Sequence, residues 1–249
     1  RTPQSLKNNN EEESYLTELK PDIILVVSYG QIIPINLLNI PKYGFLNVHA
    51  SLLPKLRGAA PIQRSIMNLD KEIGISIMKI VEDLDSGPVC NIYKIGLNQN
   101  DNAIEISKKL SLLAADKILD NVDKILKDKV KFTNQNHLKA TYAKKIDKSE
   151  GKINWNDEAS NILGKINGLL PVPGAFFNFN GERYKILKAE IGKSPGRIGE
   201  VLSNELEIGC KNNESIKIIE IQRQGKNPQK INEFILGSQI KKGSLLSNA

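Results

Sequence analysis

Two short apolar runs in the front half of the chain limit what it can fold into more than any other feature. Residues 21–30 read PDIILVVSYG, and residues 44–50 read GFLNVHA. Both runs are short and bounded by Pro or Gly, which favours buried strands over helices. The continuous β-branched run at 21–30 is typical of a strand that is covered on both faces. We therefore expect a sheet with helices packed against it.

Helical patterns alternate with these strands. Short helices are predicted at 12–19, 35–40 and 58–69, and a long amphipathic helix at 102–129, where apolar residues recur three and four apart. Residues 72–97 read as strand, loop and strand, and so tight a connection makes these two strands antiparallel. Strands that alternate with helices predict an α/β fold with an open, mostly parallel sheet.

From Tyr142 onward the pattern changes to short apolar runs separated by Gly turns, which predicts a small antiparallel β-barrel. The stretch NFNGERY at 178–184 contains the Asn-Gly pair that marks a tight β-hairpin. Residues 156–169 predict a helix in front of these strands, with Asn156 or Asp157 as its N-cap.

A length of 249 residues suits two domains. We predict a first domain over 1–129, a polar linker over 130–141 and a second domain over 142–249. The chain begins with Arg1 and a polar lead, which does not look like the first strand of a sheet. We expect that about two βα units, on the order of 60 residues, precede it in the parent protein.

The net charge of +7 is spread unevenly along the chain. Residues 1–125 carry 14 Lys and Arg against 15 Asp and Glu, whereas residues 126–249 carry 21 against 13. A basic second half favours a polyanion partner such as a nucleic acid, although a generally Lys-rich composition would give the same excess.

Other features argue against several classes of protein. Cys90 and Cys210 lie far apart and have no neighbours at metal-ligand spacing, so we expect ordinary thiols in a reducing compartment and no metal site. The sequence shows neither a run of 18 apolar residues nor a signal peptide. We expect a monomer without a membrane span, located in the bacterial cytoplasm or in an organelle matrix.

Polar side chains gather where the predicted strand at 44–50 ends. Asn47 and His49 are two residues apart, so they point to the same face of a strand. Asp85 lies in the loop of the strand pair at 72–97, and ligands of open α/β sheets bind at the carboxyl ends of strands. An amide, an imidazole and a carboxylate suit acyl-group transfer, because they can stabilise an oxyanion and move a proton. The simpler alternative is that Asn47 and His49 only cap a strand end.

No serine or cysteine is obviously paired with His49 as a nucleophile, although Ser51 lies two residues on. We therefore favour direct attack by an amine substrate over a covalent intermediate. The loop after His49 is too apolar and too poor in Gly to cradle a phosphate. Its residues Leu52, Leu53 and Pro54 can line one wall of a pocket for a flat ligand, or else pack on the sheet.

Longer stretches of the sequence carry a family resemblance. NVHASLLPKLRGAAPIQRSI at 47–66 and IMKIVEDLDSGPV at 77–89 resemble the folate-dependent formyltransferases. YAKKIDKSEGKINW at 142–155, INGLLPVPGAFF at 166–177 and QRQGKNPQKINEFILG at 222–237 resemble the carboxy-terminal tRNA-binding domain found in one branch of that family.

The resemblance implies a fold, a reaction and two partners. The fold is a Rossmann-like front domain followed by an OB-like barrel that binds tRNA, which would account for the basic second half. The reaction is transfer of the formyl group from 10-formyltetrahydrofolate, a co-substrate, to the α-amino group of methionine on initiator tRNA, for translation initiation and without a metal.

The resemblance also implies which residues act. The family's catalytic trio falls on Asn47, His49 and Asp85. Its folate-binding stretch falls on Ser51, Leu52, Leu53 and Pro54. Candidate contacts to tRNA phosphates are Lys139, Lys144, Lys145, Lys185, Lys188, Arg197, Arg223, Lys241 and Lys242.

Three alternatives remain open at this point. A formyltransferase that acts on glycinamide ribonucleotide shares the Asn-x-His and late Asp pattern but lacks the basic barrel. A sugar-formylating or formyl-hydrolysing relative fits that barrel less well. The third alternative is a non-catalytic RNA-binding protein with a decayed transferase domain, and the intact Asn47, His49 and Asp85 argue against it.

Overall fold

The chain divides into two compact units in the computed structural model, which describes residues 3–246. The first unit runs up to Pro61 and continues over 72–96 and 108–144, and the second holds 62–71, 97–107 and the chain from Lys145 onward. The segment predicted as a linker, 130–141, falls within the first unit. The outermost residues of the two predicted domains, 1–2 and 247–249, lie outside the described residues.

The predicted helices of the front half are confirmed, with ends that differ by a few residues. In chain order, the elements up to residue 144 are α1 (Asn10–Leu19), β1 (Ile24–Val26), α2 (Ile35–Leu38), β2 (Phe45–His49), α3 (Pro61–Met67), β3 (Glu72–Lys79), β4 (Val89–Gly96), α4 (Ala103–Leu126) and the 3-10 turn η1 (His137–Lys139).

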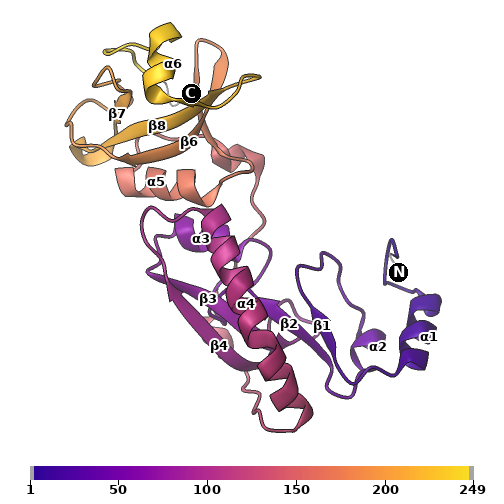
Figure 1. The fold of residues 1–249 in the computed structure, drawn as a ribbon. Coiled ribbons are helices and arrows are strands. Elements are labelled where there is room, and N and C mark those ends of the chain that lie inside the picture. The colour runs from indigo at the N-terminus through magenta and orange to yellow at the C-terminus, as the bar shows by residue number, and fades with distance from the viewer. Residues whose placement is uncertain (1–2, 247–249) are drawn as a thin grey trace. The chain divides into compact units, whose positions relative to one another are not determined.

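One sheet holds the four strands of the first unit in the order β1, β2, β3, β4 (Figure 1). β1 pairs with β2 in parallel, whereas β2 with β3 and β3 with β4 are antiparallel. The antiparallel pair predicted at 72–97 is confirmed, but the prediction of a mostly parallel sheet is wrong for these four strands. The helix α3 between β2 and β3 suggested a parallel crossover, yet an antiparallel pair accepts a connection of any length.

β1 lies at the edge of this sheet and is open on one side. Its three residues, 24–26, confirm a strand in the run at 21–30. Leu25 is 42% exposed and Val27 is 57% exposed. The prediction of a strand covered on both faces is therefore wrong, because alternate side chains of this edge strand point outward.

α4 covers one face of the sheet (Figure 1). Leu46 on β2 and Ile77 on β3 are fully buried and pack together with Ile125 of α4. Because side chains alternate along a strand, Asn47 and His49 point to the opposite face. The apolar cluster with α4 thus lies on one side of β2, whereas Asn47 and His49 share the other side with Phe45, which packs in a second apolar cluster with Ile33 and Leu37.

The second unit is built around a mostly antiparallel β-sheet. Its elements after residue 144 are η2 (Lys148–Gly151), α5 (Ala159–Gly168), β5 (Ala175–Phe179), β6 (Glu182–Ile191), β7 (Glu207–Gly209), η3 (Lys211–Asn213), β8 (Ser215–Arg223), β9 (Gln229–Lys230) and α6 (Ile231–Gly237). The sheet order is β5, β6, β8, β7, with β9 also on β8. Within residues 3–246 no pairing joins β5 to β7, so the predicted antiparallel strands are confirmed but their closure into a barrel is not seen.

The core of the second unit is a single apolar cluster between α5, α6 and the sheet. Trp155 is fully buried and contacts the ring of Phe177, with 5.8 Å between ring centroids. Phe177 in turn stacks on Tyr184 across β5 and β6. Since Trp155 is the only tryptophan of the chain, its fluorescence reports on this unit alone.

α5 begins one to two residues later than its predicted caps require. Its N-cap is Glu158, whose side chain makes no capping hydrogen bond, so the prediction of Asn156 or Asp157 as the cap is wrong. The Ala159 N–H donates instead to Glu214 Oε2 at 2.8 Å. A carboxylate distant in sequence thus satisfies a free N–H group of the first turn.

Candidate active site

β2 places two of the three predicted catalytic side chains on one face of the sheet. Asn47 is half-buried and pairs in register with Met78 of β3, and His49 is 6% exposed and pairs with Ser76. The Asn47 side chain makes no hydrogen bond within the described residues, which leaves its amide available to a ligand.

The imidazole of His49 is held from two sides. Its Nε2 lies 2.9 Å from the carbonyl oxygen of Leu56, and its Nδ1 lies 3.6 Å from Asp85 Oδ2. Because a carbonyl oxygen only accepts, Nε2 carries a hydrogen in every state of the ring. The open position of the ring is therefore Nδ1, which faces the Asp85 carboxylate.

Asp85 is fixed by one backbone N–H group and by one side-chain amide. Its backbone adopts a left-handed conformation with φ of 47°, and its side chain is 15% exposed. Its Oδ2 accepts a hydrogen bond from the Gly58 N–H at 2.8 Å, and its carbonyl oxygen accepts one from Gln135 Nε2 at 2.8 Å. The structure thus brings the Asp85 carboxylate to His49, with Asn47 two residues earlier on the same strand face.

The loop after β2 is bound to β3 through its backbone. Ser76 Oγ donates to the carbonyl oxygen of Ser51 at 2.7 Å and accepts the Leu53 N–H at 3.1 Å. The Ser51 hydroxyl donates to the Lys55 carbonyl oxygen at 2.6 Å. Since that hydroxyl is engaged within the loop and not with His49, nothing here activates Ser51 as a nucleophile.

The four predicted folate-binding residues differ in exposure. Ser51 and Leu53 are buried in the protein, whereas Leu52 and Pro54 are half-buried and keep part of their apolar surface open. This loop also supplies the carbonyl group that holds His49. The residues present therefore fit a flat, largely apolar ligand that would lie beside His49, with Leu52 and Pro54 as its contacts.

Two buried polar residues of this site were missed from the sequence. Arg57 is 3% exposed and Gln135 is 8% exposed. Gln135 Oε1 accepts from Arg57 Nε at 3.1 Å and from Nη2 at 2.8 Å. Gln135 lies in the segment predicted as a polar linker, and no local pattern marks it, because its partners are 48 to 78 residues away.

Within residues 3–246, neither the two cysteines nor the metal-ligating side chains point to a second site. Burial raises the pKa of the Cys210 thiol to about 12 and also raises the pKa of Cys90, and both thiols are free. Among residues 3–246 no three His, Cys, Asp or Glu side chains are grouped so that they could hold a metal ion. No helix in this part of the chain is long and apolar enough to span a membrane.

Comparison with known protein families matches both halves of the chain. A family model described as formyl transferase matches residues 2–151. A second model, described as the C-terminal domain of formyl transferase, matches residues 145–239.

Several curated relatives match over nearly the whole chain. A methionyl-tRNA formyltransferase of Pelagibacter ubique is 65% identical over 248 residues, which are 100% of this chain and 80% of that protein. Proteins of the same name from Caldanaerobacter subterraneus and Dictyoglomus thermophilum are 39% and 41% identical, and the match covers 98% and 97% of this chain and 80% of each relative.

Solved structures with a similar fold are more distant in sequence. HypX from Aquifex aeolicus, solved in complex with tetrahydrofolic acid, aligns with 92% of this chain and 41% of its own, with a TM-score of 0.68 and 19% identity. A methionyl-tRNA formyltransferase from Clostridium thermocellum aligns with 74% of this chain and 80% of its own, with a TM-score of 0.59 and 20% identity. At these identities the likeness shows a shared fold.

Proposed function

The chain belongs to the formyl transferase family, among the methionyl-tRNA formyltransferases, and on that premise we propose that Asn47, His49 and Asp85 are its catalytic residues. It formylates methionyl initiator tRNA and takes the formyl group from formyl-tetrahydrofolate. The observation that carries the residue assignment is the approach of Asp85 Oδ2 to His49 Nδ1, at 3.6 Å, beside the end of β2.

The Asn47 amide is the donor that we assign to the developing oxyanion. When the amino group of the methionyl tRNA attacks the formyl carbon, the formyl oxygen takes up negative charge. The Asn47 amide N–H has no partner within the described residues and can donate to that oxygen. A preorganised donor of this kind lowers the barrier by roughly 2.7–4 kcal/mol.

His49 and Asp85 move the proton that the attacking amine must lose. Leu56 keeps the Nε2 edge of the ring occupied, so the Nδ1 edge and Asp85 Oδ2 face the reacting groups together. The pair accepts the proton of the amine and delivers it to the folate nitrogen as the bond from that nitrogen to the formyl carbon breaks. The folate supplies the formyl carbon.

The folate site that we propose is the loop of Ser51, Leu52, Leu53 and Pro54. Leu52 and Pro54 would contact the flat ring system through their open apolar surface, and Ser51 and Leu53 would hold the loop in shape from within. No metal takes part in this proposal.

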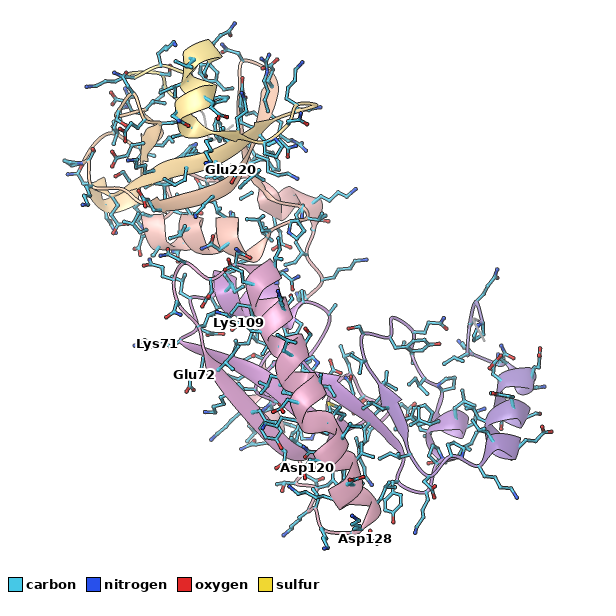
Figure 2. All side chains as sticks on the ribbon, in the orientation of Figure 1. Lys71, Glu72, Lys109, Asp120, Asp128 and Glu220 are labelled. Atoms are coloured by element: carbon cyan, nitrogen blue, oxygen red, sulfur yellow. The ribbon has the colours of Figure 1, made fainter. Side chains whose placement is uncertain are left out.

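The second unit is proposed to be an OB-like module that binds the tRNA, and the first a Rossmann-like module for the chemistry. The match of residues 145–239 to the C-terminal domain of formyl transferase supports this division, and the residues from Lys145 onward carry 16 Lys and Arg against 12 Asp and Glu. Lys188 on β6 is exposed and lies across from Glu220 of β8, which Figure 2 labels. Arg223 pairs with Glu182, so we rank it below Lys188 as a phosphate contact. We further propose that the protein acts as a monomer in the bacterial cytoplasm or an organelle matrix.

The first experiment compares substrates. The chain is incubated with 10-formyltetrahydrofolate and either methionyl initiator tRNA or glycinamide ribonucleotide. We expect formyl transfer to methionyl-tRNA only. Transfer to glycinamide ribonucleotide alone would overturn the tRNA assignment, and salt-sensitive RNA binding without formylation of either substrate would favour a non-catalytic RNA-binding protein.

The second experiment tests the residues with matched controls. We expect His49→Ala, Asp85→Asn and Asn47→Ala each to lower kcat for methionyl-tRNA about 100-fold or more. His137→Ala changes the only other histidine, which is exposed, and Asp83→Asn changes an exposed carboxylate two residues from Asp85. Equal activity of His49→Ala and His137→Ala would refute the assignment of His49.

A further inference from the structure

Gln135 uses every hydrogen-bonding group of its side-chain amide beneath the loop of Asp85. Both hydrogens of Nε2 are donated, to the carbonyl oxygens of Asp85 and Gly87, each at 2.8 Å. Oε1 accepts two hydrogen bonds from the guanidinium of Arg57. A neutral amide offers two donors and two acceptor lone pairs, so the side chain is fully satisfied at 8% exposure.

The loop that Gln135 holds is tightly bent and lies between the end of β3 and the start of β4. Asp85 adopts a left-handed backbone, which is uncommon for a residue other than Gly. At Gly87 an added Cβ would lie 1.9 Å from the carbonyl oxygen of Lys79, so the loop packs closely on the end of β3. A loop in this conformation needs partners for its carbonyl groups, and Gln135 supplies two of them.

The same side chain is tied to the group that holds the Asp85 carboxylate. Arg57, which binds Gln135 through its guanidinium, directly precedes Gly58, whose N–H donates to Asp85 Oδ2. The backbone of Arg57 is itself fixed by Thr141 and Ala143, through bonds of 2.9 and 2.6 Å. Asp85 is thereby hydrogen-bonded at its carbonyl group by Gln135 and at its carboxylate by Gly58, and Arg57 connects these two residues.

An amide is the side chain that this position requires. A carboxylate would pair more strongly with Arg57 but would place negative charge against the carbonyl oxygens of Asp85 and Gly87. An apolar side chain would leave those carbonyls and the buried guanidinium without partners. Only an amide serves the donor side and the acceptor side together.

We propose that Gln135 is a positioning residue of the reaction, which acts by fixing the backbone at Asp85 so that the carboxylate stays at His49. This inference rests on the proposed catalytic role of Asp85. It assigns a function to the segment predicted as a linker, and it explains why the buried Arg57 is bound to a neutral amide.

The test compares the same chemical change at two buried amides. Gln135→Glu keeps the shape and the acceptor for Arg57 but removes both donated hydrogens. Asn121 is the matched control, because it is fully buried on α4 and its amide donates to the Tyr93 hydroxyl at 2.9 Å and the Lys117 carbonyl oxygen at 2.8 Å. Asn121→Asp therefore removes two comparable donors that do not hold the loop of Asp85.

The first measurement is the kinetics of methionyl-tRNA formylation, corrected for the fraction of folded protein. We expect Gln135→Glu to lower kcat about 10-fold to 100-fold and to change KM for either substrate by less than about threefold, because a displaced proton-transfer group slows the chemical step. Asn121→Asp should keep kcat while it lowers stability. An unchanged kcat in Gln135→Glu would overturn the proposal.

A double substitution separates action through Asp85 from any other effect. If Gln135 works by placing the Asp85 carboxylate, Gln135→Glu has little further effect on kcat once Asp85→Asn has removed that carboxylate. If the two losses multiply, Gln135 acts elsewhere and the proposal fails.

The second measurement does not depend on catalysis. Hydrogen exchange of the Gly58 amide reports its bond to Asp85 Oδ2, and the Ile80 amide, bonded to the Phe45 carbonyl oxygen at 2.8 Å, reports the sheet next to it. In Gln135→Glu we expect exchange at Gly58 to rise about tenfold or more while Ile80 stays protected. Unchanged exchange at Gly58 would overturn the positioning role.

The two measurements also distinguish failure of this inference from failure of the proposed function. A chain that formylates neither substrate but loses protection at Gly58 in Gln135→Glu would refute the assigned chemistry and keep the structural link. A chain that formylates methionyl-tRNA and keeps kcat in Gln135→Glu would keep the function and refute the link.

Discussion

Gly58 has two roles in the site, one through its backbone conformation and one through its N–H group. Its φ of +111° lies where side chains are rarely tolerated, and an added Cβ would lie 2.9 Å from the backbone oxygen of Ala143. Its N–H also donates to Asp85 Oδ2. The residue that closes the loop after β2 is thus also the one that orients the proposed catalytic carboxylate.

Gly58→Ala should therefore damage both stability and activity. We expect a loss of about 1–3 kcal/mol in the free energy of unfolding of the first unit, from backbone strain and the contact with Ala143. We also expect kcat for formylation to fall, because the N–H that holds Asp85 must shift. Hydrogen exchange across β2 and β3 measures the first effect.

Gly96→Ala is the control for this substitution. Gly96 lies in the same unit, and nothing stands within 4 Å of an added Cβ. Its stability and kcat should stay close to those of the unmodified chain. An equal loss in both variants would show that the damage has no relation to the site.

Glu207 shows how a buried carboxylate can stabilise the second unit. Burial by itself would raise its pKa, but hydrogen bonds from Ser194, Ser215 and the Lys193 N–H outweigh burial and lower the pKa to about 2. A carboxyl whose pKa is lower in the folded state stabilises the fold above its unfolded pKa of 4.5 and loses that contribution as the pH falls toward 2.

Glu207→Gln should lower the free energy of unfolding of the second unit by roughly 2–3 kcal/mol at pH 7. The difference from the unmodified chain should shrink between about pH 4.5 and pH 2, because glutamine does not titrate. Denaturant unfolding followed by Trp155 fluorescence measures it. Glu205→Gln, which changes a surface carboxylate paired with Lys217, should leave the unfolding midpoint nearly unchanged.

At the scale of single elements, the hairpin of β5 and β6 is determined by its turn. Asn180 and Gly181 both have positive φ, at 50° and 77°, as a two-residue turn of type I′ requires. This is the turn that the Asn-Gly pair predicted from the sequence. It holds Phe177 of β5 opposite Tyr184 of β6, at the centre of the aromatic core.

Gly181→Ala should destabilise the second unit by about 1 kcal/mol, through backbone strain alone, since nothing lies within 4 Å of the added Cβ. Asn180→Gly should change stability by less than about half of that, because glycine accepts the same conformation. Trp155 fluorescence during denaturant unfolding measures both. A Gly181→Ala variant as stable as the unmodified chain would contradict the assigned turn.

Helices and strands that have a local sequence pattern could be predicted. The pairing of the strands could be predicted only in part. The periodicity of 102–129 predicted α4, and the tight loop predicted the antiparallel pair of β3 and β4. The direction of β3 against β2 could not be predicted, because a helix in the connection is compatible with either direction. The N-cap of α5 was missed since its acceptor is Glu214, 55 residues away.

The residues of the site that lie in local sequence patterns could likewise be predicted, and the residue whose contacts are distant in sequence could not. Asn47 and His49 could be placed on one face from strand alternation, and the approach of Asp85 followed from the adjacency of β2 and β3. Gln135 could not be found, because its partners are joined only by the folded chain. Short-range patterns thus indicated the proposed reacting groups and missed the residue that we propose supports them.

At the scale of the whole molecule, the uneven charge makes tRNA affinity sensitive to salt. Removing one phosphate contact should lower the slope of log Kd against log salt concentration by about 1. We expect this for Lys188→Gln in the second unit and no change for Lys108→Gln, an exposed lysine on α4 in the less basic half. Equal slopes for both variants would argue against tRNA contact through β6.

The contacts of residues 133–143 determine at which position this chain can be joined to that of a relative in a chimaeric protein. Thr133 pairs with Val89, Thr141 holds Leu56 and Arg57, and Gln135 holds the loop of Asp85. A chimaera joined at residue 130 would therefore combine the loop of Asp85 from one parent with Gln135 from the other. A chimaera joined after Lys144 would take both the loop and Gln135 from the same parent. Chimaeras with interchangeable carboxy-terminal halves should be made at the later junction, and natural exchange of these halves would leave its breakpoints there.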